Sequence, residues 1–262
     1  MRSYLYACFL TGLVFANSIG AQTAYDHYEK ALSLHYNDNV QALVEIDKAI
    51  SLARENKLVL RELYLPDFYE LRARLLFDLG RYKEAGDEYT LTLKTSKPDS
   101  LHRRYRARAN AFCRSGRYAD AISDYTASLA WKGWDSRSRG YILADRAECH
   151  LMNGRKDLAL PDIELAIATS NRASSAYNLR GKLKMEEGKL ESALEDFTNA
   201  LVADHRIEYE RNRSAVWIRL GKTEEAYRNL DLLLKDGLRG RDERLYVHRG
   251  ELAFLLGRLT RR

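Results

Sequence analysis

The stretch GRYADAISDY, residues 116–125, decides the fold because near copies of it recur along the chain. The copies begin with GRYKEAGDEY at 80, GRKDLALPDI at 154, GKLESALEDF at 188 and GKTEEAYRNL at 221. A sixth glycine, Gly257, opens a copy that stops at GRLTRR. The glycines at 80, 116, 154, 188, 221 and 257 are 36, 38, 34, 33 and 36 residues apart. Such a period predicts stacked copies of one supersecondary unit.

Residues at fixed distances from each glycine describe that unit. A small residue stands seven positions earlier: Ala73, Ala109, Ala147, Gly181, Ser214 and Gly250. An alanine follows five positions later and a bulky residue nine positions later: Ala85 and Tyr89, Ala121 and Tyr125, Ala159 and Ile163, Ala193 and Phe197, Ala226 and Leu230. Small residues let two helices approach, so the unit is predicted to be a helix hairpin whose first helix ends at the glycine.

This pattern resembles the tetratricopeptide repeat family over about residues 23–262. The resemblance implies an all-α, right-handed superhelical solenoid of about six and a half repeats. The expected repeats are 23–57, 66–99, 102–135, 140–172, 174–206 and 207–240, with a half-repeat at 243–262. The connections RENKLVLRELYLP and WKGWDSRSRG are longer than the family norm.

Two positions depart from the family pattern. Asn37 stands where the first repeat would have its glycine. Pro161 falls inside a predicted second helix, which is expected to start a turn late for that reason.

Residues 1–21 are predicted to be a secretory signal peptide, with Arg2 before an uncharged apolar run from Tyr4 to Ala16. That run is shorter than the roughly 20 residues of a spanning helix, so no permanent membrane anchor is expected. Most of it follows Cys8, which argues against lipidation there. The protein is therefore expected to be exported, to the periplasm or as a secreted protein.

Composition narrows the function classes. A chain of 262 residues with 45% hydrophobic and 31% charged residues is neither disordered nor a multi-span membrane protein. The net charge of +6 would favour nucleic acid in a cytosolic protein, but export weighs against it. Cys113 and Cys149 could form a single bridge, although two buried free thiols are the favoured interpretation.

No motif for catalysis or metal binding is recognisable, so no enzyme activity, cofactor, metal or small-molecule substrate is expected. The six histidines show no ligand spacing.

An arginine stands eight residues before every glycine, and an acid or asparagine eight residues after most of them. A buried guanidinium needs a partner, which predicts a structural ladder rather than a ligand site. Because the first repeat has Glu45 but no arginine, each arginine is expected to reach back to the preceding repeat. The expected pairs are Glu45 with Arg72, Glu88 with Arg108, Asp124 with Arg146, Asp162 with Arg180, Asp196 with Arg213 and Asn229 with Arg249.

The family resemblance places a concave groove on the first helix of each repeat. The expected peptide-binding residues are Arg74, Phe77, Arg103, Arg106, Asn110, Arg114, Leu151, Lys182, Met185, Ile218 and Phe254, with Cys113 continuing the apolar stripe. Arginines 103, 106 and 114 favour an acidic or carboxylate-bearing guest. Arg106 and Asn110 resemble half of a carboxylate clamp, but Asp145 has the wrong charge for the other half. The alternative is that the stripe only packs neighbouring helices together.

The expected function is a non-catalytic protein-interaction scaffold that binds a peptide or protein segment in this groove. One alternative is a structural subunit of an envelope or secretion assembly that uses its ends and convex face, for which the C-terminal helix is either a contact surface or a simple cap. A weaker alternative is a binder of nucleic acid or acidic polymer through HRRYRARANAFCRSGR. Trp131 and Trp134 could fold back on a helix or form a contact patch.

Overall fold

A computed structural model of the chain describes residues 22–55, 65–95, 100–170, 172–235 and 243–256. The proposed signal peptide lies outside these residues. Every regular element among them is a helix, as predicted. The chain forms two compact units, 1–132 and 133–262, and the boundary falls in the long connection around Trp131 and Trp134.

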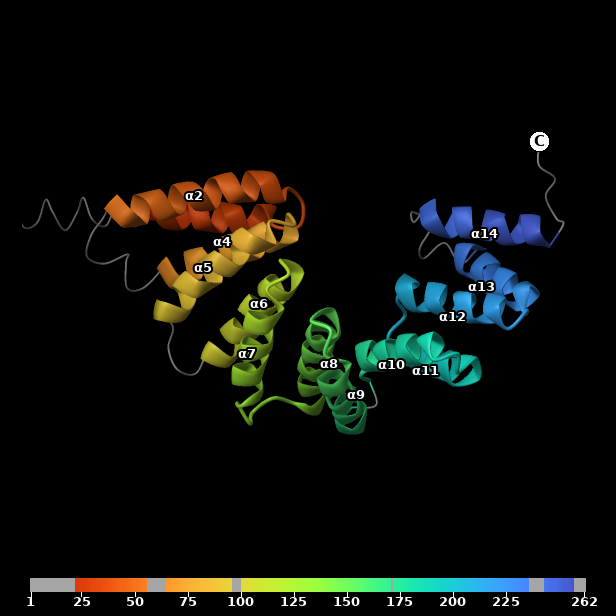
Figure 1. Cartoon of the computed structure of the whole chain (residues 1–262). Helices are drawn as coiled ribbons and strands as arrows, with labels where there is room; N and C mark the ends of the chain where they lie inside the picture. The colour runs from red at the N-terminus through yellow and green to blue at the C-terminus, as the bar shows by residue number, and fades with distance from the viewer. Residues whose placement is uncertain (1–21, 56–64, 96–99, 171, 236–242, 257–262) are drawn as a thin grey trace, which may run out of the picture. The chain divides into compact units, whose positions relative to one another are not determined.

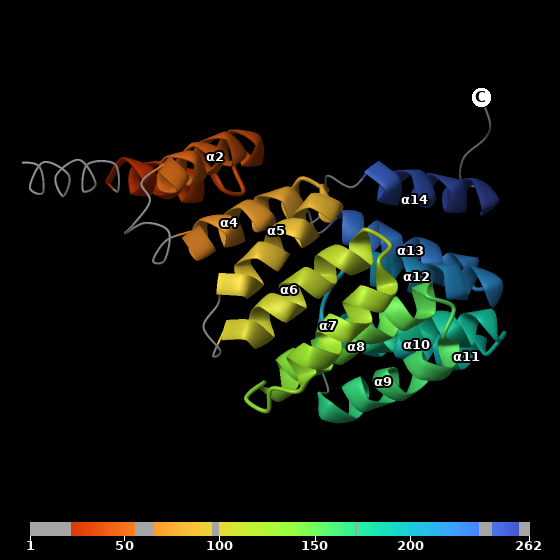
Figure 2. The same cartoon turned by 60° about the vertical axis from the view of Figure 1, so that its left-hand side comes forward.

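The first unit contains a helix at residues 22–34 and five labelled helices (Figures 1 and 2). These are α2 (Asn39–Glu55), α4 (Leu65–Asp78), α5 (Tyr82–Thr95), α6 (Leu101–Arg114) and α7 (Tyr118–Leu129). They pair as hairpins, helix 22–34 with α2, α4 with α5, and α6 with α7. Consecutive hairpins also touch, through α2 with α4 and α5 with α6.

The second unit contains α8 (Ser136–Met152), α9 (Lys156–Thr169), α10 (Ser174–Glu186), α11 (Leu190–Ala203), α12 (Ile207–Arg219), α13 (Thr223–Lys235) and α14 (Glu243–Leu255). Here α8 pairs with α9, α10 with α11 and α12 with α13, and α14 packs on α13. No described helix is long and apolar enough to cross a bilayer.

The turn glycines end the first helices as predicted. Gly116 has φ 81°, and the Arg117 and Gly116 amides donate to the carbonyls of Phe112 and Cys113 at 2.8 and 3.1 Å. This is the Schellman arrangement, in which a left-handed residue closes the helix. Each following second helix begins two residues after its glycine.

The first repeat turns one residue earlier than the sequence pattern suggests. The left-handed residue is Tyr36, with φ 74°, rather than Asn37. The Asp38 carboxylate accepts from the Gln41 amide at 2.9 Å and so caps α2, while the Tyr36 amide donates to the Asn39 side chain at 2.8 Å. These side-chain caps hold the residues from Asp38 onward in the start of the next helix, and the reversal falls before them.

The expected late start of α9 is wrong. This helix begins at Lys156, two residues after Gly154, as in the other repeats, and contains Pro161 in its second turn. The proline is exposed, so its ring lies on the solvent side while Ala159, Ile163 and Ala166 remain buried. Burial of that face offsets the single backbone hydrogen bond that proline removes.

Candidate functional site

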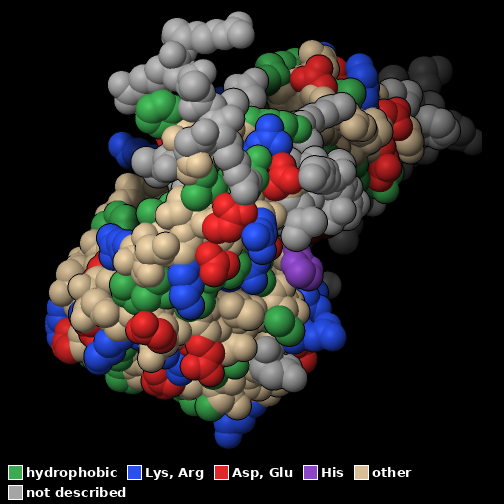
Figure 3. Space-filling view, turned by 90° about the vertical axis from the view of Figure 1, so that its right-hand side faces the viewer, with side chains coloured by type: hydrophobic (Ala, Val, Ile, Leu, Met, Phe, Trp, Pro, Cys, Tyr) green, Lys and Arg blue, Asp and Glu red, His purple; other side chains and the backbone are tan. Residues whose placement is uncertain are grey.

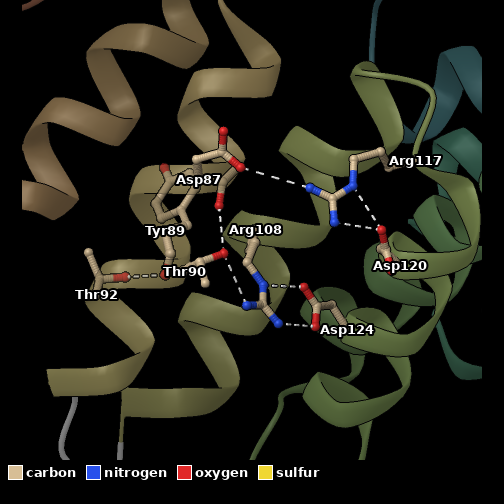
Figure 4. A network of polar contacts seen from close by, with 9 residues as sticks. Asp87, Tyr89, Thr90, Thr92, Arg108, Arg117, Asp120 and Asp124 are labelled. Atoms are coloured by element: carbon tan, nitrogen blue, oxygen red, sulfur yellow. Dashed lines mark hydrogen bonds and ion pairs between the residues drawn. The ribbon is translucent and has the colours of Figure 1, made fainter.

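The arginine of each repeat is the most regular polar feature of the structure. In Figure 4, Arg108 of α6 donates from Nε and Nη2 to the two carboxylate oxygens of Asp124 on α7, at 2.7 and 2.8 Å. Its Nη1 donates to the Thr90 hydroxyl on α5 at 3.2 Å. One guanidinium therefore joins its own hairpin to the preceding one.

The main partner lies within the same hairpin, so the predicted pairing with the preceding repeat is wrong. The pairs are Arg72 with Glu88, Arg108 with Asp124, Arg146 with Asp162, Arg180 with Asp196 and Arg213 with Asn229. Each arginine stands eight residues before the glycine and each partner eight residues after it. In an antiparallel hairpin, positions equidistant from the turn lie at the same level, and this puts the two side chains side by side.

A second contact does reach the preceding hairpin, but two positions beyond the acid that the sequence suggested. Arg72 pairs with Asp47 at 2.8 Å, Arg180 with Glu164 at 2.9 Å and Arg249 with Asp231 at 3.1 Å. The Arg108 contact to Thr90 occupies the same repeat position. At Arg72, Arg108, Arg180 and Arg249 the ladder thus links a hairpin to the preceding one.

The first repeat replaces the arginine with a histidine and two lysines. Glu45 is buried and accepts from His27 at 2.6 Å, from Lys30 at 3.1 Å and from Lys48 at 3.2 Å. The His27 and Lys30 hydrogen bonds lower the pKa of Glu45 to about 2. Glu45 is thus paired within its own repeat, which removes the reason for expecting arginines to reach back to the previous acid.

The hydrogen bonds and burial of the ladder residues shift their pKa values. The Asp124 hydrogen bond raises the pKa of Arg108, and the Asp196 hydrogen bond raises that of Arg180. At Glu88, desolvation outweighs the attraction of Arg72, so its pKa is raised. On the face in Figure 3, acidic and basic side chains likewise lie next to one another.

The predicted apolar stripe is divided between the two units. Phe77 and Cys113 belong to the first unit, and Leu151, Met185, Ile218 and Phe254 to the second. Phe254 is exposed, at 38%, and the other five are partly exposed.

Two contacts of these residues show how the stripe is used. Phe77 lies against the cluster that contains Ala73 of α4 and Ala111 of α6, and Met185 against the cluster that contains Val216 of α12. The stripe therefore joins neighbouring first helices and still presents apolar surface to solvent.

Three of the predicted polar groove residues, Arg74, Asn110 and Lys182, already contact other residues of the fold. Lys182 of α10 donates to Glu208 of α12 at 2.7 Å, and Arg74 pairs with Glu70 at 3.5 Å. The Asn110 side-chain oxygen accepts from the Tyr125 hydroxyl at 2.5 Å, which directs this amide toward α7. The Lys182 and Asn110 contacts were not predicted, because their partners come from other helices.

The arginines of helix α6 differ in whether they form ion pairs within the fold. Arg104 pairs with Glu70 at 3.0 Å, and Arg108 pairs with Asp124. Arg103 and Arg114 are exposed, and neither makes an ion pair to another described residue. With Arg106 and Asn110, at spacings of three, four and four residues, they form one side of the helix. We call these four residues the α6 basic face.

Sequence reasoning missed two features. A basic residue follows each turn glycine, and several pair nearby, such as Arg117 with Asp120 at 2.7 Å. Asn212 donates to the buried Asn178 at 2.7 Å between α12 and α10. Only the first was visible in the repeat alignment. Trp131 folds back on a helix, one of the two interpretations that the sequence left open: its ring stacks on His102 of α6 with centroids 3.7 Å apart.

The expectation of free thiols is wrong, because Cys113 and Cys149 are each disulfide-bonded. Cys149 is fully buried and Cys113 is partly exposed. In the part of the chain that the structure describes, no group of three or more His, Cys, Asp or Glu side chains is arranged to hold a metal ion.

Comparisons with known proteins agree with this fold. Residues 106–177 match the family model of the tetratricopeptide repeat. No curated protein is similar enough in sequence to count as a match.

Three solved structures illustrate the likeness. PilW, a widely conserved type IV pilus biogenesis factor, has a TM-score of 0.63 at 16% identity, over 86% of this chain and 98% of its own. A tetratricopeptide repeat protein from Parabacteroides merdae ATCC 43184 has a TM-score of 0.61 at 17% identity, over 90% and 87%. Acl4, an assembly chaperone of RpL4, has 0.59 at 13%, over 90% and 97%.

The repeated glycine, the hairpins and these comparisons agree: residues 106–177 match the tetratricopeptide repeat by sequence, and the described helices have the fold of tetratricopeptide repeat proteins.

Proposed function

We propose that the protein is a non-catalytic scaffold outside the cytoplasm that binds an acidic peptide or protein segment through the α6 basic face. The observation that carries the proposal is the sorting of arginines on α6. Arg104 and Arg108 form ion pairs with Glu70 and Asp124, whereas Arg103 and Arg114 are exposed and make no ion pair among the described residues. A guanidinium that the fold does not use can bind a carboxylate of a partner.

The apolar neighbour of this face supports a peptide as the guest. Phe77 lies against the cluster that includes Ala111 of α6 and remains partly exposed. An extended or helical segment can place an apolar side chain there and an acidic side chain on the arginines. Two structural neighbours are named as a pilus biogenesis factor and an assembly chaperone, and both names describe proteins that act on other proteins.

A peptide library displayed against the immobilised mature protein, residues 22–262, tests the proposal. We expect the selected peptides to be enriched in Asp and Glu. Replacing both exposed arginines, Arg103→Glu with Arg114→Glu, should weaken binding by about tenfold or more in fluorescence anisotropy. Arg228→Glu makes the same kind of charge change at an exposed position on α13 and serves as the control.

Two results would refute this reading. One is selection of peptides without acidic enrichment, and the other is unchanged binding by the double variant when circular dichroism shows it folded. Salt-sensitive binding of duplex DNA that the same variant loses, without any peptide binding, would favour the nucleic-acid alternative instead.

Export is the second part of the proposal, and it places the protein in the periplasm or among secreted proteins. The apolar segment before residue 22 and the disulfide-bonded state of both described cysteines support it, because disulfides persist in oxidising compartments. Protein recovered from its native source should begin near Gln22. Cys113 and Cys149 should resist alkylation until a reductant is added. A retained N-terminus or thiols that alkylate at once would contradict export.

A further inference from the structure

The outer side of α9 carries a row of apolar residues. They are Leu158, Pro161, Leu165 and Ala168, and their spacings of three, four and three residues place them along one side of the helix. Leu158 and Leu165 are 41% and 49% exposed, and Pro161 and Ala168 are exposed as well. We call these four residues the α9 row.

The repeat itself does not require apolar residues at these positions, which lie four, seven, eleven and fourteen residues after the turn glycine. At one or more of them α5, α7, α11 and α13 each carry a charged residue, such as Glu84, Asp120, Glu195 and Glu225. The α9 row contains no charged residue. A contiguous apolar surface that the fold does not need is typical of an interaction site.

The charged residues of α9 already have partners in the same chain. The pairs are Lys156 with Glu187, Asp157 with Arg155, Asp162 with Arg146 and Glu164 with Arg180, at 2.7–2.9 Å. A charged partner would lose hydration against the leucines without gaining an unpaired counter-ion on this helix, so an uncharged apolar surface is favoured. A second copy of the chain offers such a surface, and its charges around the row are paired in the same way.

The α9 row is also complementary in size to itself. Its spacings read the same in both directions, so two copies that run antiparallel bring the residues of the row to the same levels. Leu158 then lies opposite Ala168 of the second copy, and Pro161 lies opposite Leu165. Large residues thus face smaller ones, as in well-packed interiors. In a parallel pair each leucine would instead meet its own counterpart.

We propose that the α9 row is a symmetric self-association surface, on which a second copy of this chain packs its own α9 in the antiparallel direction. The same residues contribute from both copies, so the contact closes as a dimer. One side of one helix buries less than the roughly 800 Å² per partner of a standard interface, so we expect a dissociation constant of about 10–100 µM. The inference goes beyond peptide binding by the α6 basic face and does not depend on it.

Sedimentation equilibrium of the mature protein, residues 22–262, between about 1 µM and 1 mM is the test. The average mass should rise from monomer to dimer and no further, and added salt should not weaken the dimer because the row carries no charge. Leu165→Glu should weaken dimerisation by about tenfold or more, since each dimer would bury two unpaired carboxylates. Val202→Glu is the matched control, because Val202 is 80% exposed at the position of α11 that corresponds to Ala168, and it should dimerise as the wild type does.

Two further substitutions test the antiparallel pairing. Leu158→Asp and Ala168→Lys add charges of the sign that the first and last turns of a helix favour, so both variants should fold by circular dichroism. Each alone should weaken its homodimer by about tenfold. A one-to-one mixture should form a heterodimer, because the new carboxylate at position 158 meets the new ammonium at position 168 at one end, while Leu158 still meets Ala168 at the other.

Three results would overturn the proposal. One is a strict monomer over the whole concentration range, which would leave the row to another protein or, if the monomer floats with phosphatidylcholine vesicles, to a lipid surface. The second is a dimer that Leu165→Glu leaves intact. The third is a mixture of Leu158→Asp with Ala168→Lys that associates no better than either variant alone.

Discussion

Removing Asp124 should destabilise the first unit through the guanidinium it leaves behind. The Asp124 side chain is 6% exposed and accepts both hydrogen bonds of a bidentate contact from Arg108, itself 19% exposed. Breaking a fully buried pair costs about 3–5 kcal/mol, and the partial exposure of the arginine reduces the expected loss for Asp124→Ala to about 2–3 kcal/mol. That corresponds to a fall in Tm of about 5–10 °C for a chain of this size.

Urea denaturation followed by circular dichroism measures this loss as a lower midpoint at an unchanged slope. The same variant should bind the selected acidic peptides as the wild type does, because Asp124 is buried away from the α6 basic face. A change below about 0.5 kcal/mol, the usual range for surface substitutions, would refute the reasoning.

A double-mutant cycle tests the register of the ladder. Arg108 should couple to Asp124 by more than about 1 kcal/mol and to Glu88 by less than about 0.5 kcal/mol. The reason is that Glu88 pairs with Arg72 of its own hairpin. Equal or reversed coupling energies would restore the pairing between successive repeats that the chain ends had suggested.

Two further predictions concern acid stability and helix packing. The pKa of Glu45 is lowered from 4.5 to about 2, so the stability it contributes is fully present above pH 4.5 and is lost as the pH falls toward 2; the difference in urea midpoint between wild type and Glu45→Gln should shrink over that range, and a difference independent of pH would count against it. Gly181 and Gly250 share one repeat position, but a Cβ would lie 2.8 Å from the Phe197 ring only at Gly181. Gly181→Ala should therefore lower the thermal midpoint while Gly250→Ala, in open space, leaves it equal or higher by helix propensity worth about 1 kcal/mol; equal effects at both sites would refute the packing argument.

Local spacing predicted the helices well because each signal acts within a few residues. The glycine at the turn, the alanine five positions later and the bulky residue nine positions later mark a hairpin wherever they occur together. Errors arose where local side chains compete: Asp38 accepts from the Gln41 amide and Asn39 from the Tyr36 amide, and these bonds move the first turn to Tyr36. Burial of one helix face likewise kept α9 helical from Lys156 in spite of Pro161.

Only part of the candidate site could be predicted from the sequence. The run of arginines on α6 could be read directly, and so could the spacing that puts Arg103, Arg106 and Arg114 on one side. The sequence could not show which arginines pair with acids of the fold, because a partner such as Glu70 lies 34 residues from Arg104.

By itself the sequence determined the repeat, the helical class, and the existence of an arginine ladder, since all three depend on fixed spacings along one chain. Only the tertiary structure decided which acid each arginine meets. Residues 16 apart are brought to the same level by the antiparallel hairpin, as Arg146 and Asp162 are, and the third contact, such as Arg180 with Glu164, depends on how one hairpin packs on the next. Ion pairs form between side chains that are close in space, and the packing of the helices sets those distances. The pattern of apolar residues along the chain is compatible with several pairings, so the sequence alone could not choose among them.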